Sequence, residues 1–267
     1  MKIRDALPVV LLLLAASNLA AEHSPDPTRI RLANWAHLAA LTQRDFSALS
    51  SEAESGHREA QFWLGSIFVQ GRLVQKDYEQ AEMWFLKSAE DGYIPAQRAL
   101  GLLYSHSDPA KAAMWLQKAA QKGDAEAQFD LGNAYEQGSL GTINYRQALN
   151  WLQKSAKQGH PEAQAMLAQM YEDGEGVKQN YVLAAKWYRR AAEHVPNLGG
   201  AGQGRNNLGL LYLNGFGVPK NYVQAYFWFS VANAERNASY AKAHMTQAEI
   251  AKAERMANDW KSHHSQQ

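Results

Sequence analysis

Apolar residues recur along this chain at the spacing of amphipathic helices, and the whole pattern repeats. In its first complete occurrence, Ala60, Leu64 and Phe68 lie at i, i+4 and i+8, which puts them on one face of a helix. A following stretch carries Ala81 and Trp84 at helical spacing. Small residues beside one large Trp are typical of closely packed antiparallel helices. The pattern therefore predicts a pair of helices.

The same pair recurs with an underlying period of 36 residues. The leucines are Leu64, Leu100, Leu131, Leu167 and Leu208, and their spacings are 36, 31, 36 and 41 residues. The tryptophans are Trp84, Trp115, Trp151, Trp187 and Trp228, with spacings of 31, 36, 36 and 41 residues. Five residues are thus missing around SHSDPA, and five are inserted before the last repeat. A regular period of this length predicts a repeat architecture, with one core Trp in each repeat.

Glycine marks two positions in each predicted pair. Gly65 follows Leu64 inside the first helix, where glycine costs about 1 kcal/mol relative to Ala, so its recurrence predicts a close approach of two helices. A second series follows the first helix, where a left-handed residue commonly ends a helix. Its members are Gly71, Gly138, Gly174 and Gly215.

Two segments carry a family resemblance. AQFWLGSIFVQGRLVQKDYEQAEMWFLKSAEDG and AQAMLAQMYEDGEGVKQNYVLAAKWYRRAAE resemble Sel-1-like repeats, a branch of the tetratricopeptide-like solenoids. The second repeat lacks the G-x-G-V turn, the third has GSLGTIN in its place, and the fourth has Ala168 for Gly. The resemblance implies an all-α, right-handed superhelical α-solenoid of about five antiparallel helix pairs. The expected repeats are residues 60–95, 96–126, 127–162, 163–203 and 204–235.

Both flanks are expected to cap the solenoid, because terminal repeats have an unpaired face. In residues 22–59, Asp26-Pro27 reads as a helix start, and RDFSALSSEAESGH resembles a shortened second helix. In residues 236–267, Thr246 and Glu249 form a capping box that predicts a helix with an apolar stripe. Residues 263–267 are expected to fray.

The N-terminus resembles an export signal. Lys2 and Arg4 precede an apolar run from Ala6 to Ala16, and small residues follow up to Ala21. Eleven apolar residues are too few to span a bilayer, which needs about 20. We expect residues 1–21 to be a cleaved signal peptide, with an uncleaved anchor or a buried helix as the alternative. The expected location is the bacterial periplasm or beyond it.

The composition of the chain excludes several kinds of site and of binding partner. The chain has no cysteine, which excludes disulfides, thiolate metal sites, a cysteine nucleophile and a lipoprotein anchor. Its formal net charge is only +1, so no broad field favours nucleic acid or an anionic membrane. We expect a monomer without cofactor or metal and without stable membrane insertion after signal cleavage.

The glycine-dense stretch from Pro196 to Gly204 resembles a phosphate loop, with Arg205 behind it. A P-loop needs a preceding strand and a Lys, and here a predicted helix precedes it. We therefore predict an extended inter-repeat loop that acts as a hinge or as a protruding contact.

Catalytic and metal motifs are weak. Ser239 and Lys242 match S-x-x-K of penicillin-binding enzymes, but the S-D-N and K-T-G companions are absent. The acidic turn with Glu172, Asp173 and Glu175 lacks the alternating ligands of a calcium loop. His263-His264 reads as a solvated tail. We expect no catalytic residues.

The repeats themselves present a candidate surface on their first helices. Three rows at i, i+3 and i+7 lie away from the Ala–Leu–aromatic stripe and would line a polar groove if these helices form the inner curve. The candidate partner-binding residues are Trp63, Ser66, Gln70, His106, Asp130, Asn133, Gln137, Gln169, Asp173, Asn207 and Asn214. Such a groove suits an extended peptide, with Trp63 as an anchor. Solvated positions without a partner are the alternative.

The resemblance implies a non-enzymatic adaptor. We expect an exported scaffold that binds a partner protein through the solenoid surface and serves an envelope, secretion or signalling complex. One alternative is an enzyme or binder acting on cell-wall material or β-lactams. Another is a secreted factor that meets a host protein.

Overall fold

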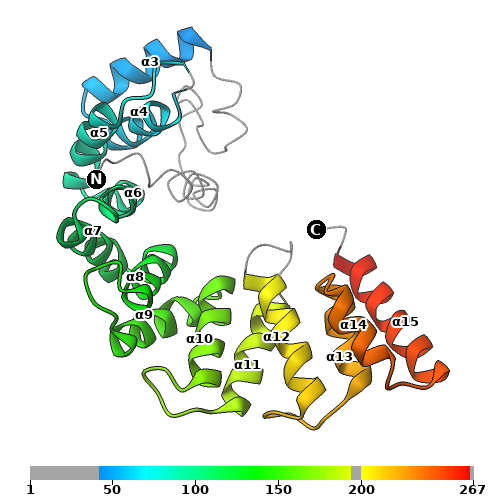
Figure 1. Ribbon diagram of the computed structural model, residues 1–267. Helices are drawn as coiled ribbons and strands as arrows, with labels where there is room; N and C mark the ends of the chain where they lie inside the picture. The colour runs from blue at the N-terminus through cyan, green and yellow to red at the C-terminus, as the bar shows by residue number, and fades with distance from the viewer. Residues whose placement is uncertain (1–41, 72, 194–199, 265–267) are drawn as a thin grey trace. The chain divides into compact units, whose positions relative to one another are not determined.

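The computed structural model describes residues 42–71, 73–193 and 200–264. These residues form thirteen α-helices, α3 to α15, and no strand (Figure 1). The all-α organisation predicted from the hydrophobic period is therefore confirmed. The expected signal peptide and the Asp26-Pro27 helix start lie outside the described residues.

The chain divides into two compact units. The first contains α3 (Gln43–Glu54), α4 (Arg58–Gln70), α5 (Tyr78–Glu90), α6 (Ile94–Tyr104), α7 (Pro109–Gln121) and the start of α8. The second contains the rest of α8 (Ala125–Gln137), then α9 (Tyr145–Lys157), α10 (Pro161–Asp173), α11 (Tyr181–Ala192), α12 (Gly200–Asn214), α13 (Tyr222–Val231), α14 (Glu235–Lys242) and α15 (Gln247–His264). Successive helices pack as the repeat predicts: α4 on α5, α6 on α7, α10 on α11 and α12 on α13 (Figure 1).

In four of the five repeats, a glycine on the first helix allows the second helix to pack closely against it, whereas the fourth repeat has Ala168 at this position. A Cβ added at Gly65 would lie 2.8 Å from a ring carbon of Phe85 on α5, and one at Gly209 would lie 2.6 Å from Phe229 on α13. These distances are too short for real atoms, so only glycine lets the helices approach this closely. The predicted reason for the recurring glycine is confirmed.

The first helices end as predicted, and each second helix is capped at its start. Gly71, Gly138, Gly174 and Gly215 have φ between 66° and 78°, the left-handed conformation that ends a helix. Asn221 then opens α13 by accepting a hydrogen bond from the backbone N–H of Gln224 at 3.0 Å. Asp77, Asp108, Asn144 and Asn180 cap their helices in the same way.

The second repeat shows where five residues were lost. Helix α6 ends at Tyr104 and α7 begins at Pro109, so only a tight turn joins them. Asp108 caps α7 and Pro109 occupies its first turn, where the missing N–H has no helical partner to lose. The deletion therefore shortens the connection and leaves the helix pair intact.

The capping helices are present, with two corrections at the C-terminus. The side chains of Thr42 and Thr246 form the capping boxes of α3 and α15, the second as predicted. Helix α14 was not predicted. Helix α15 continues to His264, so the expectation that residues 263 and 264 fray is wrong. The imidazole of His264 stacks on the ring of Trp260, with 4.1 Å between the ring centroids, and this contact supports the last helical turn.

The predicted loop from Pro196 to Gly204 is wrong over its second half. Helix α12 begins at Gly200, so Gly202 and Gly204 are helical, while residues 194–199 lie outside the described residues. A Cβ at Gly204 would lie 2.8 Å from the Cβ of Ala191 on α11. The local glycine density suggested a loop, but close packing of α12 against α11 is what this glycine allows.

Candidate partner-binding surface

The first helices present a repeated polar position near their C-terminal ends. Gln137 on α8, Asp173 on α10 and Asn214 on α12 are equivalent residues of successive repeats, and all three are exposed. Gln169, one turn earlier on α10, is also exposed, and Gln203 donates to it at 3.4 Å. In the first unit, His106 is exposed just after α6. These five candidates offer side chains to solvent.

Three other candidates are buried and offer no surface. Ser66 is fully buried and donates its hydroxyl hydrogen to the carbonyl oxygen of Phe62 at 2.8 Å. Trp63 packs edge-on against Phe62, with ring centroids 5.2 Å apart. Asp130 is also buried. The spacing i, i+3 and i+7 placed these residues on one open face of the first helices. Their exposure, however, depends on neighbouring segments, which the spacing within one helix does not describe. The expected role of Trp63 as an anchor is therefore not supported.

The remaining candidates are half-buried. Gln70 closes α4, and Asn133 accepts a hydrogen bond from the side chain of Gln137 at 2.9 Å. Asn207 donates to the hydroxyl of Tyr188 at 3.0 Å, and that hydroxyl donates to Glu172 at 2.8 Å. Asn133 and Asn207 are thus partly occupied by hydrogen bonds within the protein.

The Asn207 contacts belong to a longer polar network in the second unit. Asn206 donates to Asn207 at 3.2 Å and accepts from Asn237 of α14 at 2.9 Å, so hydrogen bonds run from α10 to α14. Burial raises the pKa of Glu172, although the hydrogen bond from Tyr188 opposes that shift. Burial also raises the pKa of Tyr188, which therefore stays a hydrogen-bond donor at neutral pH.

A buried glutamine near the start of the first helix in each of the first four repeats was missed by the sequence reasoning. Three residues before the repeat leucine stand Gln61, Gln97, Gln128 and Gln164, and in the fifth repeat Arg205. Gln61, Gln97 and Gln164 each donate to a carbonyl at the end of the preceding second helix or cap, at 3.0–3.2 Å. The recurring Ala-Gln dipeptide in the sequence was the signal that could have revealed this position.

Arg205 takes the place of that glutamine. Its Nε donates to the carbonyl oxygen of Ala192 at 2.9 Å, and the residue is 1% exposed. Its guanidinium lies 4.5 Å from the ring centroid of Trp260 on α15. Arg205 therefore joins α12 to α11 and α15. This buried position argues against the resemblance to a phosphate loop.

The S-x-x-K pair does not form a nucleophile and base. Ser239 and Lys242 are both exposed on α14, and Lys242 forms an ion pair with Glu254 at 3.0 Å. The hydrogen bond to Glu254 raises the pKa of Lys242, whereas a lysine that acts as a base needs a lowered pKa. This geometry gives no support to a β-lactam site.

The acidic turn and the terminal histidines have structural partners. The side chain of Glu172 binds Tyr188, and the pKa of Tyr145 is raised by its hydrogen bond to Glu175. His264 stacks on Trp260. Among the residues that the structure describes, no group of His, Asp and Glu is arranged to hold a metal ion.

The repeat tryptophans are core residues, as predicted, and four of them carry a cation. Trp84, Trp115, Trp151 and Trp228 are buried, and Trp187 is partly buried. A basic residue three positions later lies over the ring in the first four repeats. The pairs are Lys87 on Trp84, Lys118 on Trp115, Lys154 on Trp151 and Arg190 on Trp187, at 3.9–4.6 Å from the ring centroid. In the fifth repeat this position is Val231.

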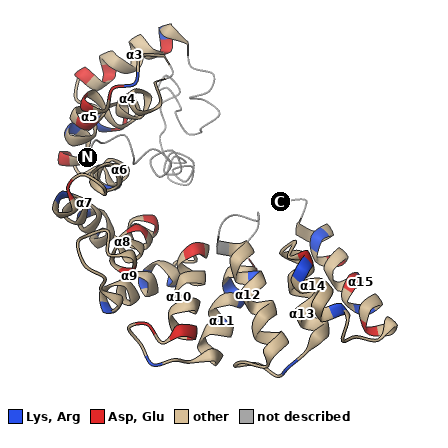
Figure 2. Ribbon diagram, viewed as in Figure 1, with Lys and Arg blue, Asp and Glu red and all other residues tan. Residues whose placement is uncertain are grey.

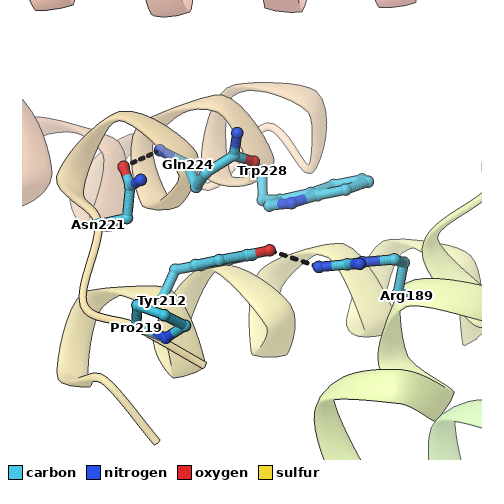
Figure 3. A pocket seen from close by; sticks show the side chains of 6 residues that line it. All are labelled: Arg189, Tyr212, Pro219, Asn221, Gln224 and Trp228. Atoms are coloured by element: carbon cyan, nitrogen blue, oxygen red, sulfur yellow. Dashed lines mark hydrogen bonds between the residues drawn. The ribbon is translucent and has the colours of Figure 1, made fainter. Parts of the chain in front are cut away.

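An open cleft of about 430 Å³ lies between α11, α12 and α13 in the second unit (Figure 3). It is lined by Arg189, Tyr212, Pro219, Asn221, Gln224 and Trp228. Figure 3 shows Gln224 and Trp228 on one side and Tyr212 and Arg189 on the other. Arg189 donates from Nη2 to the hydroxyl of Tyr212. None of these residues was among the predicted groove positions.

Charge is interspersed along both units. Basic and acidic residues are scattered over the helices of each unit, and most of each ribbon carries neither (Figure 2). Within the described residues, no helix is long and apolar enough to cross a membrane. The charge at the cleft described above comes from a single residue, Arg189.

Comparison with known proteins identifies the repeat. The Sel1 repeat profile matches residues 58–93, 94–124, 125–160, 161–194 and 203–237. Among curated protein sequences, none gave a significant match to this chain.

Two solved structures are similar. One is c5321, a protective antigen present in uropathogenic Escherichia coli strains with an SLR fold; it is 26% identical, with a TM-score of 0.74 over 98% of this chain and 62% of that one. The other is a Sel1 repeat protein from Oxalobacter formigenes, 28% identical, with a TM-score of 0.65 over 77% of this chain and 81% of that one. The predicted α-solenoid class agrees with both. The chain belongs to the Sel1 repeat family.

Proposed function

We propose that this protein is an exported scaffold that binds a partner protein through the polar surface of its repeats. Sel1 repeat proteins are generally protein-interaction scaffolds. The observation that carries the proposal is the exposed row formed by Gln137, Asp173 and Asn214 at equivalent positions of three successive first helices. Side chains repeated at one position can follow an extended partner segment from repeat to repeat.

Export is part of the proposal. It is supported by Lys2 and Arg4 followed by a short apolar run, the pattern of a secretory signal. The envelope of a bacterium would then supply the partner, in assembly, secretion or signalling. Cell fractionation of the tagged protein, together with mass determination of its N-terminus, tests both the location and the cleavage near Ala21.

The binding proposal is tested by in-cell crosslinking of the full-length chain with a C-terminal tag, followed by mass spectrometry. A variant replaces Asn133, Gln137 and Asp173 with Ser. We expect a partner that crosslinks to the unchanged protein to be recovered at least fivefold less with this variant, because two side chains of the row are lost together with Asn133, which accepts a hydrogen bond from Gln137.

The matched control replaces Gln147, Asn150 and Lys186 with Ser. These residues are also two amides and one charged group, and they are exposed on the second helices of the same repeats, α9 and α11. The control should retain the crosslink. Equal recovery with both variants would place the partner elsewhere and would refute binding through the row.

A second candidate is a secreted factor that meets a host protein. The observation that favours it is that the similar c5321 is a protective antigen present in uropathogenic Escherichia coli strains. This candidate predicts the protein in the culture medium, whereas the envelope scaffold predicts it in the periplasmic fraction. The same fractionation therefore separates the two.

A further inference from the structure

The cleft between α11, α12 and α13 combines one cation with aromatic walls. Arg189 is the charged residue among the six that line it, and no Asp or Glu lines it. A guanidinium has five N–H donors, of which Arg189 directs one from Nη2 to Tyr212. Its remaining N–H groups have no further acceptor in the part of the chain that the structure describes. They can receive a carboxylate in the two-pronged geometry that arginine favours.

Trp228 contributes a second donor without a partner. The residue is 7% exposed, and its indole Nε1–H is buried with no hydrogen-bond acceptor among the described residues. Tryptophan N–H groups usually find a partner when buried. Since Trp228 lines the cleft, a carbonyl or carboxylate oxygen of a ligand could satisfy this group.

This combination is particular to the last repeat junction. In the third repeat, the residue equivalent to Arg189 is Gln153, which donates to Tyr171 at 3.3 Å. The rings of the first four repeat tryptophans are each covered by a cation three residues later, but Val231 leaves Trp228 without one. Trp228 therefore lines the cleft without a cation from its own helix over its ring.

The helix N-terminus at the cleft already has a side-chain cap. Asn221 caps α13 and already accepts from the backbone N–H of Gln224. Chain-terminal carboxylates are commonly captured by free backbone N–H groups, so the cleft is better suited to a carboxylate held by side chains. Tyr212, Pro219 and Trp228 supply surfaces for the apolar part of an extended segment.

We propose that this cleft binds an aspartate or glutamate side chain on an extended segment of the partner protein. Arg189 pairs with the carboxylate, and the Trp228 indole N–H donates to an oxygen of the same segment. The inference rests on the proposed scaffold function and adds the chemistry of one contact. A single acidic peptide makes few contacts, so its affinity in isolation is weak.

The test follows the tryptophan indole signals of the ¹⁵N-labelled protein by NMR while peptides are added. The probe is acetyl-Gly-Ala-Glu-Ala-Gly-amide, and the comparison peptide has Gln in place of Glu. The Trp228 signal is the one absent from Trp228→Phe. We expect the Glu peptide to shift this signal with saturation in the millimolar range, at least tenfold more tightly than the Gln peptide. Arg189→Gln should weaken the Glu peptide at least tenfold.

The matched control is Arg190→Gln, since Arg190 is the next residue on α11 and lies over Trp187 outside the cleft. It should leave peptide binding unchanged. Equal binding of the Glu and Gln peptides, or unchanged binding to Arg189→Gln, would overturn the proposal. Tighter binding of acetyl-Gly-Ala-Gln-Ala-Gly with a free C-terminus would also overturn it, because the occupant would then be a chain end.

The two proposals fail in distinguishable ways. Peptide binding at the cleft is measured without any partner, so it can succeed even where crosslinking captures none; the scaffold function would then fall and the cleft would remain a carboxylate site. If a partner is captured equally by the unchanged protein and by Arg189→Gln, the scaffold function stands and the cleft is not its contact.

Discussion

The guanidinium of Arg205 lies 4.5 Å from the ring centroid of Trp260, and the two residues connect the last repeat to the C-terminal cap. Arg205 also donates from Nε to the carbonyl oxygen of Ala192, where other repeats use glutamine. Burial lowers the pKa of Arg205, although a guanidinium remains charged at neutral pH. The substitution of Arg for Gln at this position thus lets one side chain join three helices.

Two replacements of Arg205 should distinguish the energy of its contact with Trp260 from that of its hydrogen bond to Ala192. Arg205→Gln can still donate to Ala192 but loses Trp260, and we expect a loss of about 1 kcal/mol in the free energy of unfolding. Arg205→Met also leaves the buried carbonyl without its donor, so we expect about 2–4 kcal/mol. Urea unfolding of each variant, alone and combined with Trp260→Leu, measures the coupling. A coupling near zero would show that the ring contact contributes nothing.

Gly217 should tolerate no side chain. Its φ is 68°, and an added Cβ would lie 2.2 Å from the carbonyl oxygen of Tyr181, so Gly217→Ala combines left-handed strain with a backbone clash. We expect a loss of about 3 kcal/mol in unfolding free energy. Gly159→Ala is the control, since its φ is 95° and nothing lies near its Cβ; we expect about 1 kcal/mol there. Equal losses would mean that the turn moves to relieve the clash.

The cations on the repeat tryptophans should stabilise the second helices. Lys154 lies 3.9 Å from the Trp151 ring centroid, and Lys157 is in the same last turn of α9 without a ring beneath it. Both lysines lie in the last turn of α9, where the helix dipole favours a cation, so most of the difference between them reflects the ring contact. We expect Lys154→Gln to lose about 0.5–1 kcal/mol more than Lys157→Gln in thermal or urea unfolding. Lys154→Arg should retain stability.

Glu172 gives a prediction for pH. Its folded pKa is raised above the usual 4.5, mainly by burial, so the folded state favours the protonated acid. Protonated Glu172 therefore contributes fully to the free energy of unfolding below pH 4.5. This contribution is lost as the pH rises through the pKa of the folded state. Glu172→Gln cannot ionise and still accepts from Tyr188, so it should lack this loss.

Unfolding free energy measured from pH 4 to pH 7 tests this difference. As the pH rises through this range, the free energy of unfolding of Glu172→Gln should increase relative to that of the unchanged protein. Parallel curves would exclude a contribution from Glu172. Glu136, whose pKa is also raised by burial, is present in both proteins and cancels in the comparison.

The candidate surface could be predicted only in part. The repeat register correctly grouped Gln137, Asp173 and Asn214 as equivalent positions, and all three are exposed. The same register also included Ser66 and Asp130, which are buried. A helical wheel gives direction around one helix, but exposure depends on which other segments pack there.

The cleft was missed for a related reason. Arg189, Tyr212 and Trp228 come from three helices, and no local pattern in the sequence marks them as a group. The sequence shows Val231 three residues after Trp228, where the other repeats have a cation. The consequence for binding depends on which residues lie beside the Trp228 ring, and only the structure shows these.

The sequence alone determined the helix pairs, their caps and their glycines, because periodicity, capping and left-handed turns are set by residues within a few positions of one another. Leu64, Gly65 and Gly71 are sufficient to define the first helix of a repeat and its end. The tertiary structure decided the start of α12 at Gly200 and the burial of Arg205, because both depend on packing against α11 and α15. Burial and partner choice are properties of contacts between segments distant in the chain, and a local pattern does not contain them.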